Sequence, residues 1–452
     1  MKHRGLRTLY ILLLTQTFSL IGSRMTSFAI GIRVYQDTER VTPLALVGFF
    51  SVLPTILVAG VAGVLADRWD RRKVMALADA GQAATTLLLL ISFASGVFEL
   101  WHLYVLTTIS TLFGIFQGPA FMASVTMLIE DEHRDRANAI QQITGPAAGL
   151  VAPVLAGVMY AAVGITGVMA FDLFTFGVAM TVVLLTNIPT PPPSEEGEAS
   201  RGSMWRESTS GMRALWARRP FFVLILAATA VNFLLAGALM PNTAYILALT
   251  DSEAVLGVLM ALMSAGPLVG GLIMGAWGGT RPRIHTIMIG IALEGLFLAL
   301  YGISRHPIAL GASIFFVLIP IPFVDTAIMS IFQIKIPPDL QGRVISAIQQ
   351  IAQLLMPVSY LLVGPLADEV LEPAVGTAAW EPFVPLVGTQ TGAGMGLLMV
   401  ICGALITGVT LAFYALPMIR HLERDLPDYA VTIEDADPAS IPPDEAAAVP
   451  AR

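Results

Sequence analysis

The sequence predicts an all-α membrane protein in which twelve transmembrane helices form two pseudo-symmetric six-helix bundles. Three observations carry this prediction: the composition, the succession of long apolar segments and an internal repeat. The chain has 452 residues, of which 56% are hydrophobic and 13% are charged, whereas about 25% of the residues of a typical soluble protein are charged. Its mean hydropathy is +0.76. This composition excludes a soluble enzyme, a disordered chain and a nucleic-acid-binding protein.

Long apolar segments follow one another along most of the chain. A helix needs about 20 apolar residues to cross a bilayer, and the spans must be helices because lipid offers the backbone no hydrogen-bond partner. The single cysteine, Cys402, lies inside one of these segments and excludes a disulfide framework or a thiolate metal cluster. The predicted spans cover roughly 8–35, 43–66, 74–97, 101–128, 138–162, 165–187, 220–249, 253–278, 284–304, 307–334, 344–367 and 394–418.

Positive charge determines the expected orientation, because cytoplasmic connections carry an excess of Lys and Arg. With both termini inside, 21 of the 25 Lys and Arg residues fall in the tails and the inner connections. The exceptions are Arg24, Arg33, Arg40 and Arg305. The distribution therefore predicts an even number of spans with both termini in the cytoplasm.

Four segments make up the expected domain organisation. Residues 1–188 form the N-terminal six-helix bundle and residues 220–419 form the C-terminal one. Between them, residues 189–219 are a cytoplasmic linker, whose second half has the apolar face of an amphipathic helix lying on the inner leaflet. A plain solvated linker helix explains that half equally well. Residues 420–452 are acidic and rich in Pro and Ala, which predicts a disordered tail.

An internal repeat relates the two predicted bundles. The pentapeptide Ala-Ile-Gln-Gln-Ile occurs at 139–143 and again at 347–351, in each case opening a span after a polar inner loop. The segment 63–71 has a weaker counterpart at 275–283, so that the two offsets are 208 and 212 residues. Two homologous bundles predict a secondary transporter, with a substrate path between the halves that opens alternately to each side.

The connection between the second and third spans holds the most distinctive string of the chain. Gly63 allows helices to approach closely, and Asp67 can accept hydrogen bonds from the N-terminus of a neighbouring helix. A positive-inside anchor would explain the cations that follow but not the Gly, the Asp and their spacing. The residues of this predicted gating motif are Gly63, Asp67, Arg68, Arg71 and Arg72, with Arg343 as the expected partner.

This string resembles the signature loop of the major facilitator superfamily. Further features are similar to its third drug:proton antiporter branch, which includes macrolide, tetracycline and siderophore exporters: Val34 to Thr38, Leu53-Pro54, Arg136 to Ala139, and Pro337 with Gly342-Arg343-Val344. The resemblance implies the major facilitator fold. It also implies that Asp67 and the following cations latch the two halves, with Asp67 near Arg343 at the start of span eleven.

Two family patterns are only partly present. Ala152, Pro153 and Gly157 in span five resemble the small-residue motif of drug antiporters, although ordinary helix packing explains them nearly as well. Many proton-coupled relatives carry an Arg in span four, three residues before Gln-Gly. Here Gln117-Gly118 is present but that position is Gly114, so the sequence departs from the family at the usual proton relay.

Charged residues within the predicted spans are candidate proton-coupling groups, because a charge inside the membrane is costly and usually faces the bundle interior. A buried carboxylic acid favours its neutral form and can take up and release a proton as its surroundings change. Asp325 and Glu294 are the first candidates, followed by Asp172 and Arg24. The alternative for each is structural, and for Asp79 it is an ion pair with the basic loop.

The expected substrate cavity is large and mostly apolar, with a few polar groups on central spans. In helices of this kind, aromatic side chains more often pack against neighbouring helices than contact a ligand. Interhelical hydrogen bonding explains the glutamines equally well. The candidate lining residues are Phe28, Gln141, Asn232, Phe233, Gln349 and Gln353.

Together these features predict a non-enzymatic transporter in a bacterial inner membrane, which exports amphipathic small molecules such as drugs or siderophores by proton antiport. It needs no cofactor, because the proton gradient supplies the energy, and its partners are the substrate, protons and the lipid bilayer, with the chain acting as a monomer. The alternatives are a lysophospholipid flippase or an importer of the same fold, and a non-transporting receptor or assembly factor. No nucleotide-binding loop or cluster of histidines indicates an enzyme.

Overall fold

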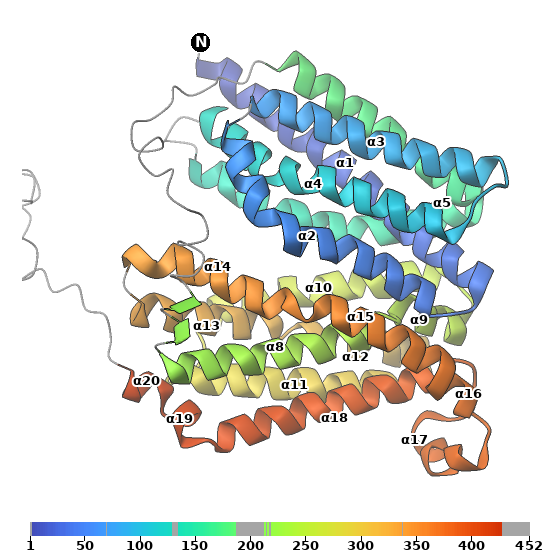
Figure 1. Cartoon of the computed structure of the whole chain (residues 1–452), viewed down its shortest axis with the longest axis vertical. Coiled ribbons are helices and arrows are strands. Elements are labelled where there is room, and N and C mark those ends of the chain that lie inside the picture. Colours follow the sequence, from blue (N-terminus) through green and yellow to red (C-terminus); the bar gives the residue numbers. More distant parts are fainter. Residues whose placement is uncertain are drawn as a thin grey trace, which may run out of the picture.

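The computed structural model describes residues 2–68, 70–128, 134–186, 212, 213, 215, 216, 218–336 and 338–426. Every regular element in these residues is a helix, and the helices form two bundles that lie side by side (Figure 1). The linker at 189–211 and the tail beyond residue 426 lie outside the described residues.

The N-terminal bundle consists of five helices, because one of them contains two passes. Helix α5 has 52 residues and is interrupted at Gly164, where φ is 67°. Glycine adopts this left-handed backbone without steric penalty, so the chain turns there from the fifth predicted span into the sixth. Helix α1 packs along α5, and α3 packs against both α4 and α5. The helices are α1 (Lys2–Thr38), α2 (Thr42–Arg68), α3 (Arg71–Ala94), α4 (Leu100–Leu128) and α5 (Arg134–Leu185).

Prolines divide three of the spans of the C-terminal bundle into shorter helices. Proline has no backbone N–H and cannot continue the hydrogen-bond ladder, and the breaks fall at Pro241, at Pro320 and just before Pro357. Helix α11 packs against α18 on one side and against α12 and α13 on the other. The helices are α8 (Arg219–Leu239), α9 (Asn242–Thr250), α10 (Glu253–Trp277), α11 (Arg283–Ile303), α12 (Pro307–Leu318), α13 (Ile321–Lys335), α14 (Pro338–Leu354), α15 (Met356–Pro365) and α18 (Ala393–Ala415).

A short folded segment connects α15 to α18 and protrudes from one end of the molecule (Figure 1). Its centre is Trp380, which is 2% exposed and donates a hydrogen bond from Nε1 to the carbonyl of Gly388 at 2.7 Å. This hydrogen bond joins two parts of the same segment and stabilises its folded form. The segment contains the π-helix η2 (Leu366–Leu371), α16 (Glu372–Ala374), the 3₁₀-helix η3 (Ala378–Phe383) and α17 (Val384–Val387).

The chain continues past α18 as two short helices, α19 (Pro417–Arg420) and α20 (Leu422–Asp425). The first residues of the predicted tail, which was expected to begin at residue 420, are therefore helical. Lys335 at the end of α13 is buried, and its Nζ donates hydrogen bonds at 2.5 Å to the carbonyls of Glu423 and Leu426. The carboxylate of Glu423 accepts a hydrogen bond from the backbone N–H of Ile284 at 2.8 Å. Helix α20 is thereby fixed to α11 and α13.

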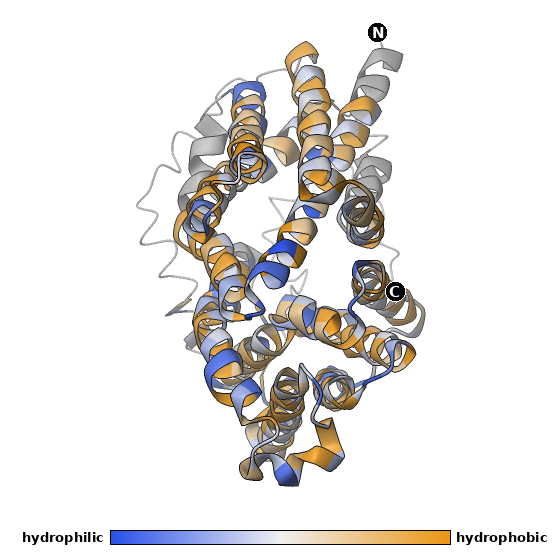
Figure 2. Cartoon of the chain, turned by 90° about the vertical axis from the view of Figure 1, so that its right-hand side faces the viewer, coloured by the Kyte–Doolittle hydropathy of each residue, from blue (hydrophilic) through white to orange (hydrophobic). Residues whose placement is uncertain are grey.

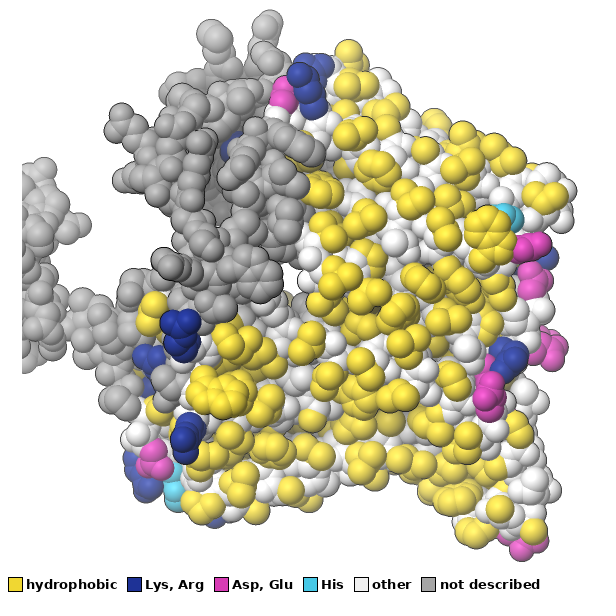
Figure 3. Space-filling view, in the orientation of Figure 1, with side chains coloured by type: hydrophobic (Ala, Val, Ile, Leu, Met, Phe, Trp, Pro, Cys, Tyr) yellow, Lys and Arg dark blue, Asp and Glu magenta, His cyan; other side chains and the backbone are white. Residues whose placement is uncertain are grey.

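Nine helical segments in the described part of the chain are long and apolar enough to cross a membrane, and one of them, Thr144–Leu185, contains the break at Gly164. Together with α1 and α2, this is consistent with the twelve predicted passes. Hydrophobic residues run along the helices of both bundles (Figure 2). The charged side chains gather at two opposite edges, with a broad hydrophobic band between them (Figure 3).

The two charged edges differ in sign. The basic end holds Arg71 to Lys73, Arg218, Arg219, Arg281, Arg283, Lys335, Arg420 and Arg424, with the acids Asp70, Glu423 and Asp425. The acidic end holds Asp37, Glu39, Glu99, Asp251, Glu253, Asp368, Glu369, Glu372 and Glu381, together with Arg33, Arg40 and Arg305.

Candidate functional site

The two bundles are joined at the acidic end by a carboxylate of one bundle that caps a helix of the other. The carboxylate oxygens of Asp368 accept hydrogen bonds from the backbone N–H groups of Val41 and Thr42, both at 2.7 Å. These two N–H groups are at the N-terminus of α2, where the free N–H donors and the helix dipole attract a negative charge. Arg40 lies 3.5 Å from Asp368 and 3.3 Å from Glu369. The Asp368 side chain is only 5% exposed, so the interaction is shielded from solvent.

A second polar contact at the acidic end connects three helices. The side-chain amide of Gln36 in α1 donates to the carboxylate of Glu253 at the start of α10, at 2.8 Å. The hydroxyl of Tyr160 in α5 donates to the amide oxygen of Gln36, also at 2.8 Å. A cavity of about 500 Å³ lies beside these contacts, with both bundles contributing to its lining, including Tyr35, Gln36, Leu247, Glu253, Asp368 and Glu372. This interface was not predicted from the sequence, because its residues are far apart in the chain.

Helices α5 and α10 cross so closely that glycine is required on both. A Cβ atom on Gly157 would lie 2.7 Å from the carbonyl oxygen of Glu253, and one on Gly257 would lie 2.6 Å from that of Pro153. Ala152 is fully buried in the same stretch of α5. The predicted small-residue motif, Ala152, Pro153 and Gly157, therefore belongs to a helix that packs against the other bundle.

Arg24 lies where the middle of α1 approaches the C-terminal bundle. A Cβ atom on Gly149 of α5 would lie 2.9 Å from Arg24 Nη1 and 2.9 Å from the hydroxyl of Ser264 in α10. The Arg24 side chain is exposed. Because a cation in the apolar band needs water or polar neighbours, this position indicates a water-accessible space between the bundles.

The candidate lining residues are distributed over several helices. Phe28, Asn232 and Phe233 are half-buried, whereas Gln349 and Gln353 are exposed on α14. Helix α14 packs against α8 and α2, so these glutamines belong to a helix close to the other bundle. The side chain of Gln141 lies outside the described residues.

The intramembrane acids do not form one cluster. Glu294 in α11 is 4% exposed, and Asp325 is exposed on the neighbouring helix α13. Asp172 is 1% exposed and lies in α5 of the other bundle. Asp79, for which the sequence suggested a pair with the basic loop, instead accepts hydrogen bonds from the amides of Gln16 and Gln117.

The predicted gating motif is only partly described. Asp70 caps α3, since its carboxylate accepts hydrogen bonds from the backbone N–H groups of Arg72 at 3.0 Å and Lys73 at 3.4 Å. Arg71 and Arg72 are half-buried in the first turn of α3. The surroundings of Gly63 and the side chains of Asp67, Arg68 and Arg343 lie outside the described part of the structure, so the proposed latch between Asp67 and Arg343 stays a prediction.

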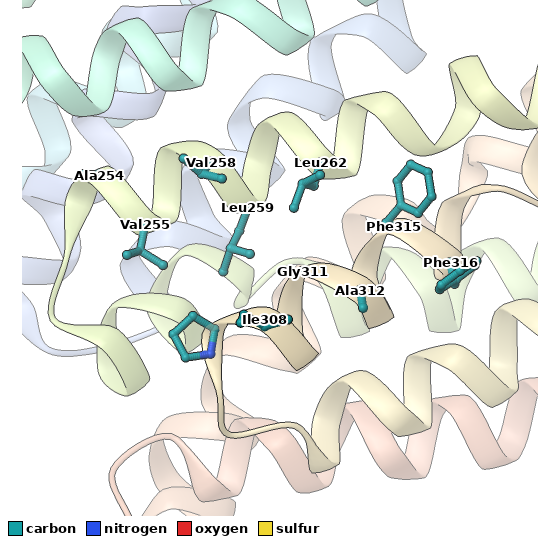
Figure 4. Close-up of a pocket in the computed structure, with 11 residues that line it drawn as sticks. Ala254, Val255, Val258, Leu259, Leu262, Ile308, Gly311, Ala312, Phe315 and Phe316 are labelled. Carbon is teal, nitrogen blue, oxygen red and sulfur yellow. The ribbon is translucent and has the colours of Figure 1, made fainter.

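An apolar groove of about 690 Å³ runs between α10 and α12 of the C-terminal bundle (Figure 4). Among its lining side chains are Val258 and Ile308, which are 51% and 76% exposed. Arg24, Asp172 and Glu294 do not line the groove, so we do not assign it to the candidate site. Its lining is Ala254, Val255, Val258, Leu259, Leu262, Pro307, Ile308, Gly311, Ala312, Phe315 and Phe316.

Comparisons with known proteins agree with this architecture. Residues 12–360 match the model of the Major Facilitator Superfamily. The chain is 26% identical over 365 residues to macrolide efflux protein A of Streptococcus pyogenes, covering 78% of this chain and 88% of that protein. It is also 26% identical over 365 residues to the multidrug efflux pump Tap of Mycolicibacterium fortuitum, covering 77% and 86% of the two chains.

Among solved structures, the fold is similar to that of a bacterial homolog of the human lysosomal transporter Spinster. The TM-score is 0.74 at 14% sequence identity, and the match covers 95% of this chain and all of the other. The nucleoside transporter NupG matches with a TM-score of 0.68 at 11% identity, over 90% of this chain and 98% of the other. The predicted fold class, an all-α membrane protein with the major facilitator fold, is thereby confirmed, and the described helices are consistent with the predicted count of twelve. The chain belongs to the Major Facilitator Superfamily and is a non-enzymatic membrane transporter.

Proposed function

We propose that this transporter exports amphipathic small molecules across a bacterial inner membrane in exchange for protons, by alternating access. The observation that carries the proposal is the way the bundles meet. Most of the buried side chains in both bundles are hydrophobic, whereas the interface at the acidic end includes separable polar contacts, such as Asp368 with the start of α2 and Gln36 with Glu253. Contacts of this kind can break and re-form while each bundle moves as a rigid body.

The direction of opening follows from the orientation of the bundles. The basic end is the cytoplasmic one, because Lys and Arg residues are retained on that side of the membrane. The acidic end then faces outward, and the contacts of Asp368 and Gln36 close the outer side. In this arrangement the substrate enters from the cytoplasm, between helices that include α1, α5, α10 and α14.

The substrate class rests on the similarity to efflux proteins. A macrolide efflux protein and a multidrug efflux pump both match more than three quarters of this chain. Amphipathic compounds suit a path that combines aromatic side chains, such as Phe28 and Phe233, with amides, such as Gln349 and Gln353. Buried carboxylates within the bundles provide sites at which a proton can bind during the exchange.

The experiment uses inside-out membrane vesicles with an acidified lumen. A macrolide, a tetracycline, a fluoroquinolone, a catechol siderophore and a lysophospholipid are added singly, and uptake is followed together with substrate-dependent proton release. We expect uptake of at least one compound that a protonophore abolishes and that vesicles lacking the protein do not show. Uptake that ignores the pH gradient would refute proton antiport. Movement of a compound only from the lumen outward would refute export.

A further inference from the structure

We infer that the proton route lies inside the N-terminal bundle, along a line of polar side chains that joins two buried carboxylates, Asp79 and Asp172. This inference rests on the proposed proton antiport and names the groups that perform it. It differs from the expectation drawn from the sequence, in which Asp325 and Glu294 of the other bundle were the first candidates.

The first cluster surrounds Asp79, which is fully buried in α3. Its carboxylate accepts hydrogen bonds from the side-chain amides of Gln117 at 2.5 Å and Gln16 at 3.3 Å. Gln117 also donates to the amide oxygen of Gln16 at 3.1 Å and accepts from Gln82 at 2.7 Å. Three helices, α1, α3 and α4, thus contribute neutral amides around one carboxylate.

The second cluster surrounds Asp172, which is 1% exposed in α5. The hydroxyl of Ser23 donates to its carboxylate at 3.2 Å, and the hydroxyls of Thr26, Thr86 and Thr175 also face it. Thr26 is itself buried, so this side of the carboxylate is shielded from solvent.

Gly22 brings α1 close enough to form the second cluster. A Cβ atom at this position would lie 2.9 Å from the carboxylate of Asp172 and would also collide with the hydroxyl of Thr175. The close approach of α1 and α5 at this point therefore depends on the absence of a side chain.

The two clusters are in register along α1 and α3. Gln16 and Ser23 are seven residues apart on α1, and Asp79 and Thr86 are seven residues apart on α3. Seven residues correspond to about two helical turns, or roughly 10 Å. Buried Ser19, together with Gln82 and Thr85, provides polar groups in the interval. Polar side chains of α1 and α3 thus occur at the level of each carboxylate and at the levels between them.

The described partners of both carboxylates are neutral. Arg24 is next to Ser23 in α1, but its guanidinium faces Gly149 and Ser264 at the interface between the bundles. The cations at the start of α3, Arg71 to Lys73, lie about two turns from Asp79. A buried carboxylate with only amide or hydroxyl partners is costly in its ionised form, so each acid readily takes up a proton that reaches it.

Transfer along this line moves one proton from one acid to the other. Asp172 lies nearer the acidic, outward end and gives up its carboxyl proton to become a carboxylate. Asp79 lies nearer the basic, cytoplasmic end. After it has released its own proton to the cytoplasm, its carboxylate takes up the proton from Asp172 and becomes neutral again. The charge of the pair does not change, and the substrate path between the bundles remains separate from the proton route.

The test compares Asp79→Asn and Asp172→Asn in proteoliposomes of the full chain, using a compound that the wild-type protein exports. Uptake driven by a pH gradient requires proton coupling, whereas counterflow at equal pH requires only substrate exchange. We expect each variant to lose at least tenfold in gradient-driven uptake and to keep counterflow within about twofold. Glu99→Gln, at an exposed carboxylate outside the bundle, is the matched control and should change neither rate.

Several outcomes would overturn the inference. Gradient-driven uptake that persists in both variants, or that is lost in Asp325→Asn alone, would place the proton elsewhere. If a variant also loses counterflow, the conservative variants Asp79→Glu and Asp172→Glu are measured in its place. Gradient-driven uptake that is restored with an altered pH profile supports the route. Uptake that is not restored overturns it. A wild-type protein that ignores the pH gradient would instead refute the proposed function.

Discussion

Removing the charge of Asp368 should open the outer side of the transporter. In Asp368→Asn the side chain keeps one carbonyl oxygen, so one of the two hydrogen bonds to the start of α2 is lost and the other becomes neutral. The ion pair with Arg40 is lost as well, although Arg40 is 52% exposed and the pair contributes little. A hydrogen bond to a charged group contributes about 1.5–3 kcal/mol.

The expected loss is therefore about 2 kcal/mol, which shifts the equilibrium between closed and open outer sides roughly 30-fold toward the open form. Spin labels at Glu99 and Glu381, exposed at the acidic end of the two bundles, report this change as a distance distribution by double electron–electron resonance. Cys402 is buried and is replaced by Ser in the labelled protein. The wild-type protein should give a short distance, and Asp368→Asn should add a longer one.

Glu369→Gln is the control for this experiment. Glu369 is adjacent in sequence and also contacts Arg40, but its side chain is 67% exposed, and exposed ion pairs contribute at most about 1 kcal/mol. Its distance distribution should match that of the wild-type protein. If Asp368→Asn also matches the wild-type protein, the capping of α2 does not hold the outer side closed and the reasoning fails.

Three further predictions concern packing and anchoring. Gly157→Leu places a side chain against a carbonyl of α10 and should reduce transport at least tenfold. The control is Gly177→Leu, on the same helix with no neighbouring atom within 4 Å, and its transport rate should stay within about twofold of the wild-type rate. Equal rates of the two variants in the vesicle assay would contradict this prediction. Lys335→Met removes a buried ammonium from two carbonyls near α20 and should cost about 2 kcal/mol, seen as a lower midpoint of thermal unfolding in detergent. Tyr245→Phe removes a hydroxyl that lies 3.0 Å from the carbonyl of Gly302. It should lower the free energy of unfolding by about 1 kcal/mol, and therefore the same midpoint by less than Lys335→Met does. Unchanged midpoints would show that neither the Lys335 nor the Tyr245 hydrogen bonds stabilise the fold.

The fold was predictable from the sequence because its signals are local. Whether a segment enters the membrane depends on its own residues, and the break at Gly164 and the divisions at Pro320 and Pro357 follow from the backbone properties of those residues. The folded segment around Trp380 was not predicted, because its short helices depend on one tryptophan closing a loop on itself.

The site was less predictable, because its contacts join distant parts of the chain. Nothing in the sequence near Asp368 indicates that it meets Val41 and Thr42, more than 300 residues away. Asp79 seemed a partner for the adjacent basic loop, but helix packing instead directs the amides of Gln16 and Gln117 toward it. Proximity in sequence suggested the wrong partner, and only the packed bundle reveals the neutral surroundings of this acid.

The measurement that tests proton-coupled export most directly starts from a substrate gradient without a pH gradient. Proteoliposomes of the full chain are loaded with a transported compound, diluted into the same buffer, and followed with a pH-sensitive dye inside. Exchange requires that substrate leaving the vesicle brings protons in, so the interior should become acidic, and Asp172→Asn should abolish this change while counterflow continues. Substrate that leaves at the wild-type rate with no change of internal pH would contradict antiport.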